Sequence, residues 1–558
     1  MKRKALLVTA LLAAAAVLTT ACGSLMTAPQ TQSSAKDSYV MSESAAESYN
    51  GAASAPTAVY EAGEAMAAYD MYEEYDEYEY EEPYDPGYVG EMNTEEYSYR
   101  QENSFVTVEA HPFSTFAADV DTASYANMRR QLLKGGQIVP DSVRIEEMVN
   151  YFRYDYPEPE TGEPFSVTTE IADCPWNPEA KLMLVGLQAM EPDLDEMPRS
   201  NLVFLIDVSG SMDDPAKLPL VQRSFLTLVE NLDDRDVVSM VTYSSGERVV
   251  LDGVSASNRN EIMTAVESLQ AYGSTNGEDA LNTAYRLAEQ NFIEGGNNRI
   301  IMATDGDFNV GISSEGELTR LVKDKAKNGV FLSVLGYGMG NYKDNKLESL
   351  ADNGNGNYAY IDTIDEARKV LVSEAGGTLF TVAKDVKLQV EFNPERVQAY
   401  RLIGYENRKM SAQDFADDTK DGGEIGAGHQ VTALYEIIPV GSEYEIDGVE
   451  SRYSDKDKDK ETKEESAYAN EYCIVRIRYK EPDGDTSTLI EKLVTVDAER
   501  DEMSANLSWA AGVAQVGMLL KDSEYAGSSD FEEVKERLKA IADDDFRLEF
   551  VYLISKMK

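Results

Sequence analysis

Apolar segments of strand length alternate with amphipathic segments of helix length between residues 201 and 375. The segment 201–207, NLVFLID, is apolar until it ends in an aspartate, and the segment 298–307, NRIIMATDGD, repeats that arrangement. Long apolar runs of this kind are typical of strands that are covered on both faces of a sheet. The alternation predicts an α/β fold with a doubly wound, mostly parallel sheet. In such sheets, ligands bind at the carboxyl ends of the strands.

Strand patterns also flank this α/β region on both sides. Alternating or continuously apolar runs of strand length lie at 165–171, 182–188, 385–392, 431–440, 473–480 and 487–496. Because these runs precede and follow the α/β region, we expect one β-sandwich-like companion domain into which the α/β domain is inserted. The last portion of the chain is predicted to be helical. Its apolar segment 505–520 is short and flanked by charges, which indicates a core helix rather than a membrane span.

The N-terminus has the pattern of an export signal. A basic start, an apolar stretch and small residues precede Cys22, as in a secretory signal peptide. The sequence TTACGS around Cys22 resembles a bacterial lipoprotein cleavage site, which implies that Cys22 becomes the lipidated N-terminus; the alternative is an ordinary signal peptide that Cys22 merely follows. We therefore expect an exported protein, lipid-anchored to the cell membrane and facing outside the cytoplasm.

These patterns divide the chain into consecutive parts. We expect a signal peptide at 1–21, a disordered acidic and tyrosine-rich tether at 22–103, an N-terminal part of the companion domain at 104–198, the α/β domain at 199–376, a β-rich part of the companion domain at 377–498 and a helical region at 499–558. The tether is predicted because its like charges repel and no apolar face repeats along it.

The charge balance and the scarcity of histidine restrict the function. The chain carries 101 acidic and 51 basic side chains, for a net charge of −50. Such a molecule repels polyanions, so no nucleic-acid partner is expected. The only histidines are His111 and His429, which argues against an imidazole metal centre and against a Ser-His-Asp hydrolase. We interpret His429 as a structural hydrogen-bonding residue.

Polar side chains gather at the ends of the predicted strands and in nearby loops. They are Asp207, Ser209 and Ser211 in the pattern D-x-S-x-S, then Thr275, then Asp305. Two carboxylates and three hydroxyls suit a hard divalent cation, Mg²⁺ first, with Mn²⁺ or Ca²⁺ as alternatives. Burying the two aspartates without a cation would be costly or would force them to hold protons. The alternative interpretation is that these serines and aspartates only cap the helices that follow.

The same residues resemble the metal-ion-dependent adhesion site of the von Willebrand factor type A (VWA) domain. The resemblance rests on D-x-S-x-S, a downstream threonine and a later aspartate in this order. It implies that Ser209, Ser211 and Thr275 bind the metal directly or through water, and that Asp207 and Asp305 complete the shell and balance its charge. It also implies an open metal position that an Asp or Glu carboxylate of a protein partner fills.

The flanks resemble bacterial VWA lipoproteins of the YfbK type, in the segments STFAADVDTASYANMRRQLLKGG and GAGHQVTALYEI. This resemblance covers the chain from about residue 104 to its end. It implies the architecture and the location of the protein more than its biochemistry.

Three functional hypotheses follow. The first is a cell-surface protein-binding module that depends on a divalent cation, with a role in adhesion or as an envelope scaffold. The second is a metal-dependent hydrolase, but no general base or nucleophile is indicated beside the metal, so we expect no enzyme. The third is a structural spacer that does not need the metal ligands.

Two smaller expectations concern the companion domain. Cys174 and Cys473 lie on opposite sides of the α/β insertion, and a disulfide between them is one hypothesis, with two separate thiols as the other. We also interpret Asp121 or Thr122 as the N-terminal cap of the helix that follows them.

Overall fold

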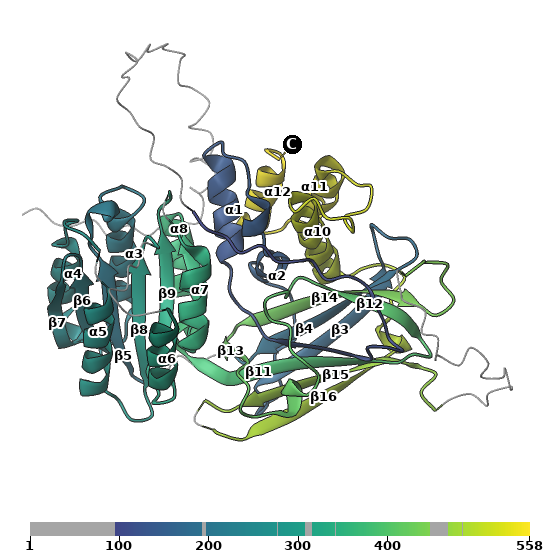
Figure 1. The fold of residues 1–558 in the computed structure, drawn as a ribbon, viewed down its shortest axis with the longest axis horizontal. Helices are drawn as coiled ribbons and strands as arrows, with labels where there is room; N and C mark the ends of the chain where they lie inside the picture. The colour runs from purple at the N-terminus through teal and green to yellow at the C-terminus, as the bar shows by residue number, and fades with distance from the viewer. Residues whose placement is uncertain are drawn as a thin grey trace, which may run out of the picture. The chain divides into compact units, whose positions relative to one another are not determined.

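The computed structural model describes residues 95–191, 197–275, 277–306, 315–340, 342–446, 467–482 and 484–557 (Figure 1). The expected signal peptide, most of the expected tether and the lipidation candidate Cys22 lie outside these residues.

The α/β domain is built on a six-stranded sheet with the order β10-β9-β8-β5-β6-β7. Neighbouring strands are parallel except for β7, which runs antiparallel to β6. This arrangement confirms the predicted doubly wound sheet. The strands are β5 (Ser200–Asp207), β6 (Val237–Tyr243), β7 (Glu247–Ser255), β8 (Asn297–Thr304), β9 (Phe331–Tyr337) and β10 (Tyr358–Ile361).

Helices cover both faces of this sheet, which explains the continuous apolar run in β5. Its residues Leu202, Phe204 and Ile206 face one core, and Val203 and Leu205 face the other. The first core is closed by α3 (Leu218–Asn231), α4 (Arg259–Glu267) and α8 (Ile364–Arg368), and the second by α5 (Glu278–Gln290), α6 (Glu315–Ala326) and α7 (Asp344–Asn353). A π-helical turn, Lys369–Ser373, and α9 (Ala375–Leu379) lead out of the domain.

The companion domain consists of two antiparallel sheets, and both flanks contribute to each. The first has the order β1-β12-β14-β4-β3, and in the second β11 lies between β13 and β15, β16 follows β15, and β2 also pairs with β11. The predicted sandwich from both flanks is thereby confirmed. The strands are β1 (Val106–Thr107), β2 (Phe113–Ala117), β3 (Phe165–Asp173), β4 (Lys181–Ala189), β11 (Thr381–Phe392), β12 (Val397–Ile403), β13 (Gly423–Gly426), β14 (Gln430–Pro439), β15 (Glu471–Lys480) and β16 (Ser487–Thr495).

A layer of helices covers the outer face of the first sheet. In β4, Met183 and Val185 pack between the two sheets, while Leu182 and Leu184 pack under the helices. The helices are α1 (Ala123–Leu133), α2 (Ile145–Asn150), α10 (Ala505–Leu520), α11 (Phe531–Lys539) and α12 (Asp545–Ile554). The apolar α10 is largely buried in this core, as predicted. Within the described residues, no helix is both long enough and apolar enough to cross a bilayer.

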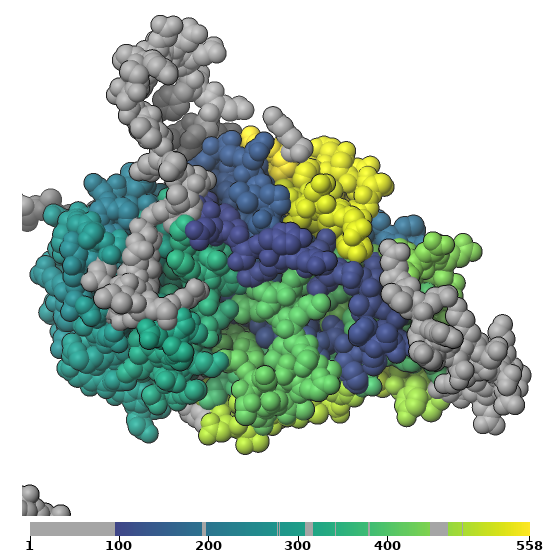
Figure 2. Space-filling view, in the orientation of Figure 1, coloured from purple at the N-terminus to yellow at the C-terminus, as the bar shows by residue number. Residues whose placement is uncertain are grey.

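The segment that begins at Glu95 differs from the expected tether, which was to extend to residue 103. Glu95 forms an ion pair with Arg130 of α1, and the Asn103 side chain donates hydrogen bonds to two backbone carbonyls near the end of β12. Figure 2 shows this segment, in purple, running across the surface from the α/β domain toward the companion domain. The residues 95–103 are therefore bound to the folded part of the chain, because their charged and polar side chains find buried partners there.

Two further expectations need correction. Thr122 stands at the N-cap position of α1 but makes no capping hydrogen bond, and Asp121 instead accepts hydrogen bonds from the Tyr358 backbone N–H and from Arg408. The disulfide hypothesis is wrong, because Cys174 and Cys473 are both free and belong to different cores.

Candidate metal centre

Asp207 and Asp305 meet at the carboxyl edge of the α/β sheet. Asp207 is the last residue of β5, and Asp305 directly follows β8, the strand that pairs with β5 in parallel. Both side chains are fully buried, and the Thr304 hydroxyl donates a hydrogen bond of 3.3 Å to Asp207 Oδ2. The fold therefore places two carboxylates side by side where ligands bind in sheets of this class.

The D-x-S-x-S loop turns back over this edge. The Ser209 backbone N–H donates a 2.9 Å hydrogen bond to Asp207 Oδ1, and the Ser209 and Ser211 hydroxyl oxygens lie 3.0 Å apart. A short 3-10 turn, Gly210–Met212, carries Ser211 to the surface, whereas Ser209 is buried. The site therefore opens to solvent at Ser211.

A second loop approaches the first and carries Thr275. The Gly210 N–H donates a 2.9 Å hydrogen bond to the Gly273 carbonyl, and the Tyr272 N–H donates one of 2.8 Å to the Val208 carbonyl. A Cβ atom at position 210 would lie only 3.0 Å from the Gly273 oxygen, so glycine permits this close approach. Thr275 is half-buried two residues further along this loop.

The charge of Asp305 influences the pKa of Asp207. Burial raises the pKa of Asp207 to about 7, and the charge of Asp305 adds to this rise, while hydrogen bonds from Ser209 and Thr304 oppose it. A buried carboxylate pair of this kind is stabilised by a cation at its side.

A cationic side chain that no sequence motif indicates contacts this pair. Lys217 precedes α3, is buried, and places its Nζ 3.0 Å from Asp305 Oδ2. Its methylene carbons lie against Gly338, in the loop after β9, where a Cβ atom would overlap them. The only signal in the sequence was a lysine at the start of an amphipathic segment, which is common and therefore not specific.

The donor set fits a hard divalent cation. The site offers carboxylate and hydroxyl oxygens, and its two aspartates are the acids that a cation would neutralise. Within the described residues, no group of three or more His, Cys, Asp or Glu side chains is arranged to hold a metal. A metal here would therefore depend on the serine and threonine hydroxyls as well as on the two carboxylates.

His429 does not take the hydrogen-bonding role expected of it. Its ring is buried against Gly377, its Nδ1 has no hydrogen-bond partner among the described residues, and burial lowers its pKa to about 3. It lines a cavity of about 30 Å³, which has room for roughly one water molecule. The ring is therefore a neutral, buried group.

Known proteins resemble the chain along most of its length. The family described as "von Willebrand factor type A domain" matches residues 201–371, "Uncharacterized protein YfbK, C-terminal" matches 377–558, and "von Willebrand factor" matches 91–184. The protein described as "Uncharacterized protein YfbK" of Escherichia coli K12 is 41% identical over 479 residues, which cover 84% of this chain and 82% of that protein.

Two further similarities are weaker: one covers a smaller part of this chain, and the other has a lower sequence identity. The human inter-alpha-trypsin inhibitor heavy chain H4 is 32% identical over 170 residues, or 29% of this chain and 18% of that protein. The solved structure "von Willebrand factor type A from Catenulispora acidiphila" is 16% identical, with a TM-score of 0.39, and covers 72% of this chain and 91% of that one. Because the match to the Escherichia coli YfbK protein is 41% identical and covers more than four fifths of both chains, the chain belongs to the YfbK family of proteins with a von Willebrand factor type A domain.

Proposed function

We propose that the VWA domain binds a protein partner through a divalent cation, and that the chain is a lipid-anchored binding protein outside the cytoplasm. The observation that carries this proposal is the convergence of Asp207, Ser209 and Asp305 at one strand edge, with Ser211 exposed beside them. An oxygen site that opens to solvent suits a ligand that arrives from outside the domain.

The residues divide into two roles in this proposal. Ser209, Ser211 and Thr275 would hold the cation through their hydroxyl oxygens, while Asp207 and Asp305 balance its charge. Mg²⁺ fits this donor set best, with Mn²⁺ or Ca²⁺ as alternatives. The bound cation supplies a Lewis-acidic position for an Asp or Glu carboxylate of the partner.

The two other hypotheses make different demands. A hydrolase would need a general base or nucleophile that is not occupied by the metal. In this proposal the two carboxylates and the three hydroxyls all serve the cation, and Lys217 is ion-paired with Asp305. We therefore propose binding without catalysis. A structural spacer would retain its function after loss of the metal ligands, which an experiment can distinguish.

The metal is tested by titration calorimetry of the full chain with MgCl₂. We expect saturable binding of one ion by the wild type and its loss in Asp305→Ala. Asp214→Ala is the matched control, because Asp214 is an exposed acid on the same loop. Equal binding by wild type and Asp305→Ala would remove the site.

The partner is tested by capture from a membrane and envelope extract with the immobilised full chain. We expect proteins that bind with Mg²⁺, elute with EDTA and return when Mg²⁺ is restored, and that fail to bind Ser211→Ala. Capture that is unaffected by EDTA and by Ser211→Ala would favour the structural spacer.

The anchor is tested separately by fractionation of cells that express Cys22→Ser. We expect this variant to be released from the membrane or left unprocessed, because the lipid attached to Cys22 provides the attachment. A fully processed variant that stays membrane-bound would show that Cys22 is not lipidated.

A further inference from the structure

A cavity of about 1490 Å³ lies between the α/β domain and the companion domain, away from the metal centre. One wall is formed by the amino ends of β8 and β9, and the opposite wall by the start of β11 and the end of β15. The metal centre lies at the carboxyl end of β8, so the two sites occupy opposite edges of one sheet. Pockets for drug-sized ligands measure roughly 300–1,000 Å³, so this cavity has room for more than one small unit.

Two lysines of the walls form ion pairs with carboxylates of the same walls. Lys480 lies 2.7 Å from Asp385 and donates a further hydrogen bond to a backbone carbonyl, and Lys323 pairs with Asp421. Lys384 differs from them. It is half-buried, and within the described residues it makes neither an ion pair nor a side-chain hydrogen bond.

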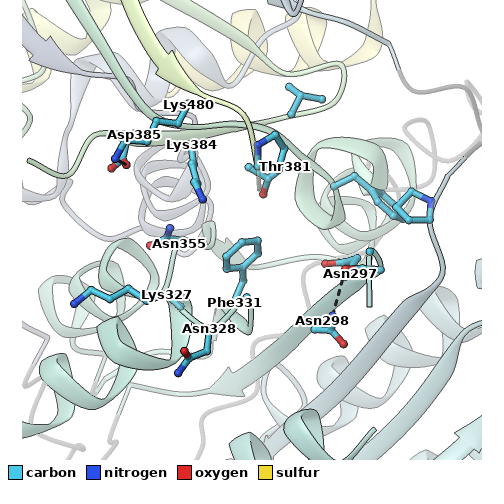
Figure 3. A pocket seen from close by; sticks show the side chains of 18 of the residues that line it. Asn297, Asn298, Lys327, Asn328, Phe331, Asn355, Thr381, Lys384, Asp385 and Lys480 are labelled. Carbon is cyan, nitrogen blue, oxygen red and sulfur yellow. Dashed lines mark hydrogen bonds and ion pairs between the residues drawn. The ribbon is translucent and has the colours of Figure 1, made fainter. Parts of the chain in front are cut away.

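The backbone around Lys384 is arranged in an uncommon way. Lys384 stands directly opposite Lys480 across the β11–β15 pair, which sets two like charges side by side. The register shifts immediately after it, and Asp385 has a positive φ of 54°. A bulge with a non-glycine residue in this region redirects a side chain at a conformational cost, and such features collect at functional sites. In Figure 3, Lys384 extends from β11 into the cavity, on the side where Asn355 and Phe331 lie.

The wall that faces Lys384 carries an amide and an aromatic ring, with a buried guanidinium behind the ring. Asn355 also has a positive φ, of 51°, and within the described part of the chain its side-chain amide makes no hydrogen bond. Phe331 contributes an aromatic ring, with the Arg299 guanidinium over it at 5.5 Å. Arg299 is buried, and its side-chain hydrogen bonds within the described residues go to the hydroxyls of Ser333 and Thr381. Burial lowers its pKa to about 10, although the charge of Glu424 opposes this. Behind the wall there is therefore a second cation, for which the described part of the chain provides no ion pair.

We infer that this cavity binds a sugar residue that carries a carboxylate, free or within a chain. The ammonium of Lys384 pairs with the carboxylate, the amide of Asn355 exchanges hydrogen bonds with hydroxyls, and Phe331 packs against the apolar face of the sugar ring. A ligand with several phosphates or sulfates is disfavoured, because Glu294 and Asp485 are exposed acids at the same cavity. A single negative charge among many hydroxyls suits Lys384, which has no ion-pair partner within the described residues, and the amide of Asn355 in the facing wall.

The experiment is saturation-transfer NMR and titration of the full chain with D-glucuronate, with D-glucose as the neutral analogue. We expect saturation transfer to glucuronate well above that to glucose. Lys384→Met should weaken glucuronate binding at least about tenfold, because it removes a charge-assisted hydrogen bond. Lys384→Arg should keep most of it. Lys492→Met, an exposed lysine on β16, is the matched control and should bind as the wild type does.

Other outcomes would overturn the inference. They are absence of transfer to glucuronate, equal transfer to glucose, unchanged binding in a folded Lys384→Met variant, or tighter binding of D-glucose 6-phosphate or of a tetraglutamate peptide than of glucuronate. A thermal melt of each variant shows whether it is folded. Asp305→Ala should bind glucuronate normally, so failure of the metal centre and failure of this cavity are distinguishable.

Discussion

The Lys217 ammonium lies 3.0 Å from Asp305 Oδ2, inside the group of oxygens that we propose as a divalent-cation site. The proposed metal site thus contains a positively charged side chain, which forms an ion pair with one of the two buried carboxylates. The positive charge of this lysine would repel a divalent cation bound to the same carboxylates. The lysine is therefore expected to lower the affinity for the metal while it stabilises the metal-free domain.

Lys217→Met should bind Mg²⁺ more tightly than the wild type. We expect about a tenfold gain in affinity, on the order of 1.4 kcal/mol, because a competing positive charge is removed. The metal-free variant should melt at a lower temperature, since the buried Asp305 carboxylate then loses the ammonium that pairs with it. Titration calorimetry and thermal melts with and without MgCl₂ measure both effects. Lys346→Met, an exposed lysine of α7, is the control; unchanged or weaker Mg²⁺ binding by Lys217→Met would contradict the competition.

A second prediction concerns the attachment of the N-terminal segment to α1 and to the loop after β9. Burial alone would raise the pKa of Glu95, but hydrogen bonds and charge from Arg130, together with the Gly340 N–H, hold that pKa below its usual value. Arg130→Met should lower the free energy of unfolding by about 3 kcal/mol, because the buried carboxylate of Glu95 then loses the guanidinium that neutralises it. Urea denaturation measures this loss.

Two variants make that test specific. The double variant Arg130→Met with Glu95→Gln should recover part of the loss, because residue 95 then carries no charge that needs Arg130. Arg153→Met breaks an ion pair with Glu191 in which both side chains are more than half exposed, and it should cost less than about 1 kcal/mol. Equal losses of unfolding free energy in Arg130→Met and Arg153→Met would show that the Glu95–Arg130 pair adds no more stability than an exposed ion pair.

The sheet and most of its polar edge could be predicted because their signals are local. The run in β5 that ends in Asp207 indicates a buried strand and a polar terminus within a few residues. Lys217 could not be found in this way, because its importance arises from Asp305, which is distant in sequence. The loop after β9 fixes the lysine through Gly338, and no sequence pattern indicates that contact.

The sequence indicated the fold class of the companion domain but not which of its strands pair with each other. Strand patterns in both flanks indicate a sandwich, yet β2 pairs with β11 through contacts such as Phe113 with Glu391, which are far apart in the chain. The short β13, GEIG, has no strand pattern of its own. It is positioned by tertiary packing, since a Cβ atom at Gly426 would overlap the Gly377 backbone. The cavity between the domains likewise depends on long-range assembly.

A third prediction uses the pH dependence of stability. Burial raises the pKa of Glu146 to about 8, and the charges of Glu406, Glu147 and Asp119 add to the rise. Because the folded-state pKa exceeds the unfolded value of 4.5, the folded state binds more protons between these pH values. The stability that the folded protein gains from keeping Glu146 protonated is complete below about pH 4.5 and is lost as the pH rises through 8.

Glu146→Gln should therefore show a smaller loss of stability between pH 5 and 8 than the wild type. Both oxygens of Glu146 lack a hydrogen-bond partner within the described residues, so the neutral amide replaces no existing bond. Urea denaturation across this pH range measures the difference in slope. The exposed Glu158→Gln is the control and should follow the wild type. Identical slopes for wild type and Glu146→Gln would mean that Glu146 is ionised in the folded protein.

The last prediction concerns the two thiols of the companion domain. Cys473 lies between the two sheets, with its Sγ 3.6 Å from Met183 Sδ, whereas Cys174 lies under the helical layer on the other side of the first sheet. Burial raises the pKa of both thiols above the usual range, so each is held as an unreactive thiol. Iodoacetamide should therefore leave both unmodified in the folded protein and alkylate both in urea without a reductant. Peptide mass spectrometry identifies each cysteine separately, and a Cys174–Cys473 cross-linked peptide from unreduced protein would contradict the separation of the two cores.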